Sequence, residues 1–163
     1  MLRNAWIYLE NGTFFEAKSF GAHTTAVGEI VFNTSMSGYQ EIITDPSYAG
    51  QFVTFTMPEI GNVGVNDEDM ESNSAYCKGI IVRQYQSNYS NFRAQEALHS
   101  FLDRHNIIGL CDIDTRFLTK MIRTEGAMMM IASTEISDKD ELKFVYKLLT
   151  FFIQIRTKCL FFI

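Results

Sequence analysis

The sequence predicts a mixed α/β domain of the α+β kind, built on a mixed sheet. Apolar runs rich in β-branched and aromatic residues fill the first half of the chain, whereas apolar residues at helical spacing begin near position 94. Further strand-like runs then alternate with the helical segments. Strands followed by alternating strands and helices are typical of α+β or layered α/β domains.

Strand-like runs at residues 5–9 and 13–20 flank the pair Asn11-Gly12. An Asn-Gly pair in this position predicts a tight hairpin in which both turn residues take positive φ. We expect further strands at 26–33, 51–57 and 79–83. A short helix at 38–43 should end before Asp45-Pro46, because the residue before proline disfavours the α region. The glycine-containing, acidic segment 58–71 should be an exposed loop.

Three amphipathic helices are expected in the second half of the chain. Residues 94–105 carry an apolar stripe at helical spacing, and residues 115–123 follow Asp114, whose side chain suits the N-cap position. Gly126 should end that second helix. The third helix should span 138–149, and strands at 107–111 and 127–133 should separate the helices.

Composition excludes several classes of protein. The chain of 163 residues is 47% hydrophobic and 20% charged with a net charge of −5, which is ordinary for a folded domain. A mildly acidic chain has no general attraction to nucleic acid or anionic lipid. Its start lacks the features of a signal peptide, and no apolar run reaches the ~20 residues of a membrane span. We therefore expect a cytoplasmic protein without nucleic-acid or membrane partners.

No complete set of catalytic or metal-binding residues is evident. Cys77, Cys111 and Cys159 are too widely spaced for a metal site, and we expect buried thiols in a reducing cytosol. Cys111 lacks the flanking glycines of an exposed nucleophile, and Cys77 lies near a loop end. Asp112 and Asp114 could form a carboxylate pair, although a helix cap at Asp114 explains the second one better.

The other motifs that carry chemistry are missing or scattered. Phosphate-binding and dinucleotide-binding glycine patterns are absent from the sequence. His23, His99 and His105 are dispersed, and the last two are not at the i, i+4 spacing of a helical metal pair. We therefore predict no catalytic residue, no metal site and no cofactor in this chain.

The polar segment 34–48 (TSMSGYQEIITDPSY) is the most unusual part of the sequence. A loop rich in small hydroxyl residues between buried strands can contact a ligand or a partner. The same composition also fits hydroxyls that are satisfied within turns, and residue types alone leave both interpretations open.

Several long segments resemble one family, the small subunits of carbamoyl phosphate synthetase. They are VGEIVFNTSMSGYQEIITDPSYAGQFVTFTMPEIGNVGVN at 27–66, SNFR at 90–93, HNIIGLCDIDTRFLTKMIRTEGAMMMI at 105–131, and the opening LENGT. The resemblance covers residues 1–149. It implies a three-layer β/β/α domain with a mixed sheet, of the swivelling-domain type, and the first of two domains in the small subunit.

In that family the second domain is a glutamine amidotransferase with a Cys nucleophile and a His/Glu pair. It releases ammonia from glutamine, and the ammonia reaches the large subunit, where ATP and metal ions are expected. There carbamoyl phosphate is formed for arginine and pyrimidine synthesis. This chain ends before such a domain, so the resemblance implies a truncated small subunit without a glutaminase site of its own.

The resemblance implies one substrate-binding residue and one partner. Ser47, in the TDPSY motif, matches a family serine that contacts L-glutamine at the interdomain cleft; a turn cap after Pro46 is the alternative. The partner is the large subunit, and we expect segments 33–39 and 61–66 to contribute to that contact.

The tail at 150–163 (TFFIQIRTKCLFFI) resembles nothing in the family. It could form a final strand or helix packed on the core. We instead interpret it as an end foreign to the domain, because an exposed apolar segment of this kind promotes aggregation. The domain boundary is therefore predicted at 149, and a truncated remnant without activity is the alternative to a working subunit.

Overall fold

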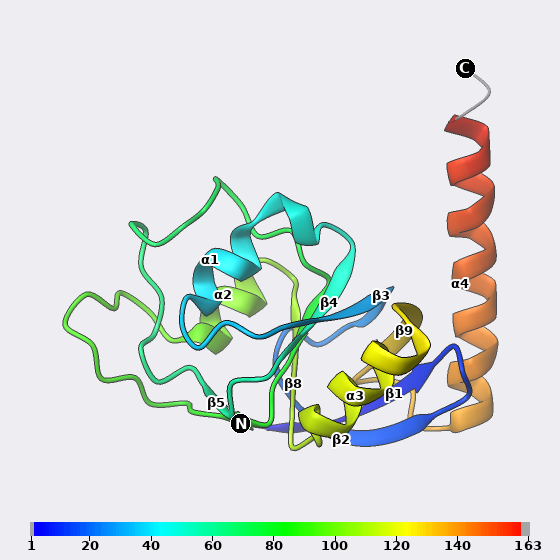
Figure 1. Cartoon of the computed structure of the whole chain (residues 1–163), viewed down its shortest axis with the longest axis horizontal. Coiled ribbons are helices and arrows are strands. Elements are labelled where there is room, and N and C mark those ends of the chain that lie inside the picture. Colours follow the sequence, from blue (N-terminus) through cyan, green and yellow to red (C-terminus); the bar gives the residue numbers. More distant parts are fainter. Residues whose placement is uncertain (1, 161–163) are drawn as a thin grey trace.

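The computed structural model describes residues 2–160, with side chains described through Ile155. Seven strands in this part of the chain form a closed barrel in the order β1-β2-β8-β6-β4-β3-β9 (Figure 1). They are β1 (Arg3–Leu9), β2 (Phe14–Gly21), β3 (Thr25–Asn33), β4 (Gln51–Phe55), β6 (Gly79–Ile81), β8 (Ile108–Cys111) and β9 (Met128–Ser133).

The barrel is mixed, as predicted. The neighbouring pairs β3–β4, β4–β6 and β6–β8 are parallel, and the other pairs are antiparallel. The barrel closes where β1 pairs with β9, and in this pairing Trp6 lies opposite Ser133. The fold is thus a mixed α/β domain, and the closure of its sheet was not predicted from the sequence.

The predicted hairpin joins β1 and β2, but its turn is longer than expected. Gly12 has a φ of 90°, whereas Asn11 is not among the residues with positive φ. The backbone N–H of Gly12 donates to the Leu9 carbonyl at 2.9 Å, and the N–H of Leu9 donates to the Thr13 carbonyl. The Asn11 side chain accepts from the N–H of Thr13 at 3.0 Å. The two-residue turn prediction was therefore wrong: this is a three-residue loop with one left-handed glycine.

Two faces of the barrel strands pack against different partners. On β4, Phe52 joins the inner core with the apolar side of α3 (Thr115–Glu125), whereas Val53 and Phe55 pack outward. The outer cluster includes apolar residues of α1 (Tyr39–Thr44) and α2 (Leu98–Arg104). The alternation follows from strand geometry, in which successive side chains point to opposite faces.

Helix α2 is shorter than the predicted segment 94–105. Val65 and Glu96 form an isolated antiparallel bridge, in which the N–H of Val65 donates to the Glu96 carbonyl at 3.0 Å. Ala97 is extended and serves as the N-cap. The apolar stripe therefore located the helix correctly, but a long-range backbone contact set its start.

The predicted exposed loop at 58–71 is partly buried, so that prediction was wrong in part. Its first residues form β5 (Glu59–Ile60), which pairs in parallel with β7 (Gln84–Tyr85). Ile60 and Val65 are buried in the outer cluster. The segment is thus anchored at Ile60 and Val65. Most of its acidic residues come after Val65, within 67–71.

Helix α4 (Lys139–Leu160) covers another side of the barrel, where Leu142 and Tyr146 pack on Tyr8 and Ile131. It begins near the predicted position but continues past 149 to Leu160, and its later turns extend beyond the barrel (Figure 1). The proposed boundary at 149 falls inside this helix and stays a prediction, and residues 161–163 lie outside the described part. Within that part, no helix is long and apolar enough to cross a membrane.

Candidate functional site

Ser47 lies in the middle of a short 3-10 turn, η1 (Pro46–Tyr48), and its side chain is exposed. Pro46 suits the first position of the turn because its φ is already fixed. The Asp45 carboxylate accepts a hydrogen bond from the Ser47 backbone N–H at 2.8 Å. Hydrogen bonds from Ser47, chiefly this backbone bond, hold the pKa of Asp45 below its usual value.

Hydrogen bonds to neighbouring segments hold the turn on both sides. Asn33, at the end of β3, donates its Nδ2 to the Tyr48 hydroxyl at 2.9 Å. After the turn, the N–H of Gly50 donates to the Tyr76 carbonyl at 3.4 Å, and the N–H of Tyr76 donates to the Ile43 carbonyl at 3.2 Å. The exposed serine therefore stands on a backbone that neighbouring segments hold in place.

A hollow of about 730 Å³ lies beside the serine turn. The residues that follow the turn, from Ala49 to Gln51, form part of its wall. Strand β3 contributes residues including Gly28, and α4 contributes Phe152 from across the hollow. Ser47 is at the approach to this hollow along the chain, without lining it.

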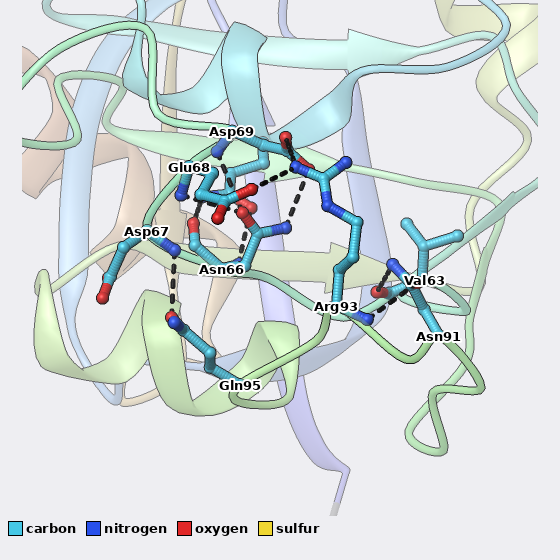
Figure 2. Close-up of polar contacts among 9 residues, drawn as sticks. Val63, Asn66, Asp67, Glu68, Asp69, Asn91, Arg93 and Gln95 are labelled. Carbon is cyan, nitrogen blue, oxygen red and sulfur yellow. Dashed lines mark hydrogen bonds and ion pairs between the residues drawn. The ribbon is translucent and has the colours of Figure 1, made fainter.

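A second feature is the loop face, which we define as the surface of residues 61–69 and 89–95. Asn66 is its centre (Figure 2). The Asn66 Oδ1 accepts from the backbone N–H groups of Glu68 and Asp69 at 2.9 Å each, and its Nδ2 donates to the Asp69 carboxylate at 2.7 Å. The hydrogen bond from Asn66 is the chief reason that the pKa of Asp69 is lowered.

Arg93 links the two halves of the loop face. Its Nη2 contacts the Glu68 carboxylate at 2.9 Å and the Asp69 carboxylate at 2.8 Å (Figure 2). These partners raise the pKa of Arg93. Exposed ion pairs stabilise a fold only weakly, so their main effect here is to order side chains. Asn91 Nδ2 also donates to the Val63 carbonyl at 3.2 Å.

Helix α1 holds the loop face from beneath through two buried residues. Gln40 donates its Nε2 to the Asn66 carbonyl, while its Oε1 accepts from the Asn66 N–H at 3.0 Å. Gln40 is 4% exposed. The hydroxyl of Tyr39 donates to the Gly64 carbonyl at 2.6 Å, and burial raises the pKa of Tyr39. A loop held by buried side-chain hydrogen bonds is ordered well beyond what its composition suggests.

Large apolar side chains project from this ordered surface. Phe92 is 98% exposed, and Val63 and Tyr89 are also exposed. Met36, which is 72% exposed, precedes Gly38, and Gly38 shares a small hollow with Val63 and Asn91. An apolar group that rigid backbone holds in water is typical of a protein–protein contact.

The other candidate residues are placed in structural roles. Cys77 and Cys111 are buried, and burial raises the pKa of each thiol to about 12, so neither is an activated nucleophile. The Cys159 side chain lies outside the described residues. Asp114 caps α3 by accepting from the Phe117 N–H at 3.0 Å, as predicted.

The histidines do not form a cluster. His99 contacts the Tyr85 hydroxyl through Nδ1 at 2.8 Å, His105 lies against the Phe101 ring, and His23 contacts Thr134. Among the described residues, no group of three or more His, Cys, Asp or Glu side chains could hold a metal ion. Among the described residues, the arrangement offers an exposed hydroxyl at Ser47 and an apolar contact surface on the loop face.

The sequence of this barrel domain matches one class of protein. The model of the carbamoyl-phosphate synthase small chain, CPSase domain, matches residues 7–132. This chain is 59% identical to the carbamoyl phosphate synthase small chain of Helicobacter hepaticus over 143 residues, which is 88% of this chain and 38% of that protein. It is 54% identical to the small chain of Escherichia coli K12 over 127 residues, covering 78% of this chain and 33% of that protein.

The chain therefore belongs to the carbamoyl-phosphate synthase small-chain family, through that family's CPSase domain. It spans less than two fifths of the length of these relatives. Among solved structures, an aminopeptidase from Aneurinibacillus sp. strain AM-1 is similar with a TM-score of 0.46 and 12% identity, covering 80% of this chain and 30% of that one. A score this low supports no argument about function.

Residue types did not identify the centre of the loop face. Asn66 and Gln40 are ordinary polar residues in the sequence, and their pairing across 26 positions is visible only in the fold. The resemblance did point to segment 61–66 and to SNFR. Phe92 itself carried one usable signal, because a phenylalanine between Asn91 and Arg93 has no apolar neighbour in sequence to pack with.

Proposed function

We propose that this chain is the large-subunit-docking domain of a glutamine-hydrolysing carbamoyl phosphate synthase small subunit. In this role it binds the large subunit and supplies one wall of the site for L-glutamine. The glutaminase chemistry belongs to an amidotransferase domain outside residues 1–163. Carbamoyl phosphate formation, with ATP and metal ions, belongs to the large subunit, in the cytoplasm.

The near-complete exposure of Phe92 on the ordered loop face carries the docking half of this proposal. The side chain gains no apolar burial within the domain, so a partner that covers it would recover that free energy. Because the loop is already held by Gln40 and Arg93, docking would cost little ordering entropy. Glu68 and Asp69 both contact Arg93, the residue after Phe92, and two carboxylates against one guanidinium leave negative charge that favours a partner surface with basic residues.

The turn that carries Ser47 supports the second part of the proposal, that this chain supplies a wall of the glutamine site. Ser47 is exposed, its backbone is fixed by Asp45, and the turn leads into the wall of a hollow. A serine hydroxyl can donate to a carboxylate or accept from an ammonium group, and free glutamine carries both. The exposed position fits a wall that a second domain completes. The three-layer swivelling-domain assignment is part of the same proposal, since the closed barrel by itself does not distinguish it.

Docking is tested by mixing the purified chain with a carbamoyl phosphate synthase large subunit from Helicobacter hepaticus and measuring sedimentation. We expect a complex with the wild-type chain and at least about tenfold weaker binding with Phe92→Glu. Phe144→Glu is the matched control, because Phe144 is also exposed but lies on α4. No complex with the wild-type chain would refute docking and favour an inactive remnant.

The glutamine wall is tested by adding a separately produced amidotransferase domain of the same relative to that complex. We expect Ser47→Ala to raise the KM for glutamine about tenfold, as one lost hydrogen bond to a charged group would do. Ser100→Ala, an exposed serine on α2, should leave the KM unchanged. Equal KM values for both variants would remove Ser47 from the site while leaving the docking result intact.

A further inference from the structure

Another hollow, of about 520 Å³, opens where the start of β1, the end of β2 and helix α2 meet, and we call it the strand-end hollow. Tyr85 of β7 and Ser87 complete its wall. None of the described residues that line it belongs to the loop face or to the turn that carries Ser47. Its volume is that of an ordinary small-molecule site, which is about 300–1,000 Å³.

One wall of the strand-end hollow is apolar and fixed in place. The Phe20 and Tyr85 rings stack with their centroids 3.9 Å apart and their planes 5° apart. The Tyr85 hydroxyl meets His99 Nδ1 at 2.8 Å, which ties the ring to α2. A Cβ on Gly21 would lie only 2.8 Å from the Leu102 Cβ, so β2 packs directly against the same helix. A wall that is already ordered costs a ligand little entropy on binding.

The strand-end hollow also holds an unpaired cation. Within the described part of the chain, the Arg3 guanidinium has no ion-pair or hydrogen-bond partner. Arg104, which lines the same hollow, is instead paired with Glu96 and lies 5.5 Å from the Phe101 ring centroid. A free guanidinium can bind a carboxylate through two parallel hydrogen bonds.

Ser19 adds a buried polar group beside this cation. It is 3% exposed, and its hydroxyl has no hydrogen-bond partner among the described residues. In the described part, the unpartnered side-chain atoms that are fully enclosed belong to Thr54 and His105, so the Ser19 hydroxyl can still be reached from outside. Ser19 lies opposite Arg3 in the pairing of β1 with β2, and both residues line the hollow. The hydroxyl is therefore free to bond a ligand that Arg3 binds.

We propose that the strand-end hollow binds a small organic carboxylate that carries an aromatic or branched apolar group. Arg3 and Ser19 hold the carboxylate, and the apolar group lies against Tyr85 and Leu2. Asp103 also lines the hollow and repels a second negative charge, which favours a monoanion over a dianion such as a phosphate ester. The site shares no residue with the proposed docking surface or glutamine wall, so it stands whether or not those proposals hold.

The first test is an NMR titration of the ¹⁵N-labelled full chain with phenylacetate at constant ionic strength. We expect saturable shifts of the Ser19, Tyr85 and His99 amides, with a dissociation constant of about 1 mM for a ligand of about ten heavy atoms. Acetate lacks the ring and 2-phenylethanol lacks the charge, and each should bind at least about fivefold more weakly. No saturable shift at these residues up to about 20 mM, or equal binding of acetate, would overturn the proposal.

Phenyl phosphate tests the class of anion in the same titration. At pH 7.5 it is largely a dianion, and we expect it to bind no more tightly than phenylacetate because Asp103 lies at the same hollow. Clearly tighter binding of phenyl phosphate would overturn the assignment to a carboxylate.

The second test changes the groups that hold the carboxylate. Arg3→Gln should weaken phenylacetate binding at least about fivefold, and Ser19→Ala about threefold, while Arg3→Lys should fall between wild type and Arg3→Gln. Arg116→Gln is the matched control, because Arg116 is an exposed arginine on α3 outside the hollow. Circular dichroism checks that each variant is folded. Equal dissociation constants for the wild-type and Arg3→Gln chains, or equal losses for Arg3→Gln and Arg116→Gln, would overturn the proposal.

Discussion

Replacing Gln40 by leucine should destabilise the domain more than the small change in side-chain volume suggests. In the native chain, Gln40 satisfies both the N–H and the carbonyl of Asn66, and both residues are buried. Leucine has a similar volume but no polar atoms, so two backbone groups would lose their partners. An unsatisfied buried group costs about 1–3 kcal/mol, and partial entry of water leaves an expected loss of about 2–4 kcal/mol.

The assay is urea unfolding followed by circular dichroism, with the m-value checked for constancy. At an m-value of about 2 kcal/mol/M, the midpoint should fall by about 1–2 M. Gln95→Leu is the matched control, because exposed Gln95 accepts from the Asp67 N–H at 3.0 Å and water can replace it. The control should lose less than about 0.5 kcal/mol. Equal losses for the two variants would refute the claim that a buried clamp holds the loop face.

Three other predictions concern the rest of the domain. The pKa of Asp45, followed by NMR, should lie below the ordinary 3.8 because the backbone N–H two residues later donates to it; its contribution to stability is therefore present above the unfolded pKa and is lost as pH falls through the lower folded value. Cys77 and Cys111 are buried, and burial raises the pKa of each thiol to about 12. In a Cys159→Ser chain at pH 8, neither thiol should react with a disulfide reagent until urea unfolds the protein. Fast reaction of the native protein would contradict this. Gly109→Ala should lower stability by about 1–3 kcal/mol in thermal unfolding, because its Cβ would lie 2.4 Å from the Phe20 carbonyl oxygen; an unchanged midpoint would show that β2 and β8 can separate freely.

Local patterns predicted much of the secondary structure, for reasons visible in particular residues. Asp114 caps α3 as expected, because a cap depends on atoms three residues apart. The hairpin between β1 and β2 was also predicted, although its turn type was not. Barrel closure was missed because Trp6 and Ser133 meet across the length of the chain, a pairing that no local pattern encodes.

The candidate site could likewise be predicted only in part from the sequence. Ser47 came from a resemblance, and the structure leaves it exposed on a fixed turn, where its role in glutamine binding stays a prediction. The clamp between Gln40 and Asn66 could not be predicted, since a polar residue becomes structural only when its partner is known. Segment 58–71 was expected to be an exposed loop because its glycines and acidic residues outnumber Ile60 and Val65, which anchor it.

The central claim is that the loop face docks a carbamoyl phosphate synthase large subunit. The most direct measurement is the dissociation constant of that complex for the wild-type, Phe92→Glu and Phe144→Glu chains under one set of conditions. The account predicts tight binding for the wild-type and Phe144→Glu chains and at least about tenfold weaker binding for Phe92→Glu. Equal dissociation constants for all three chains would contradict it.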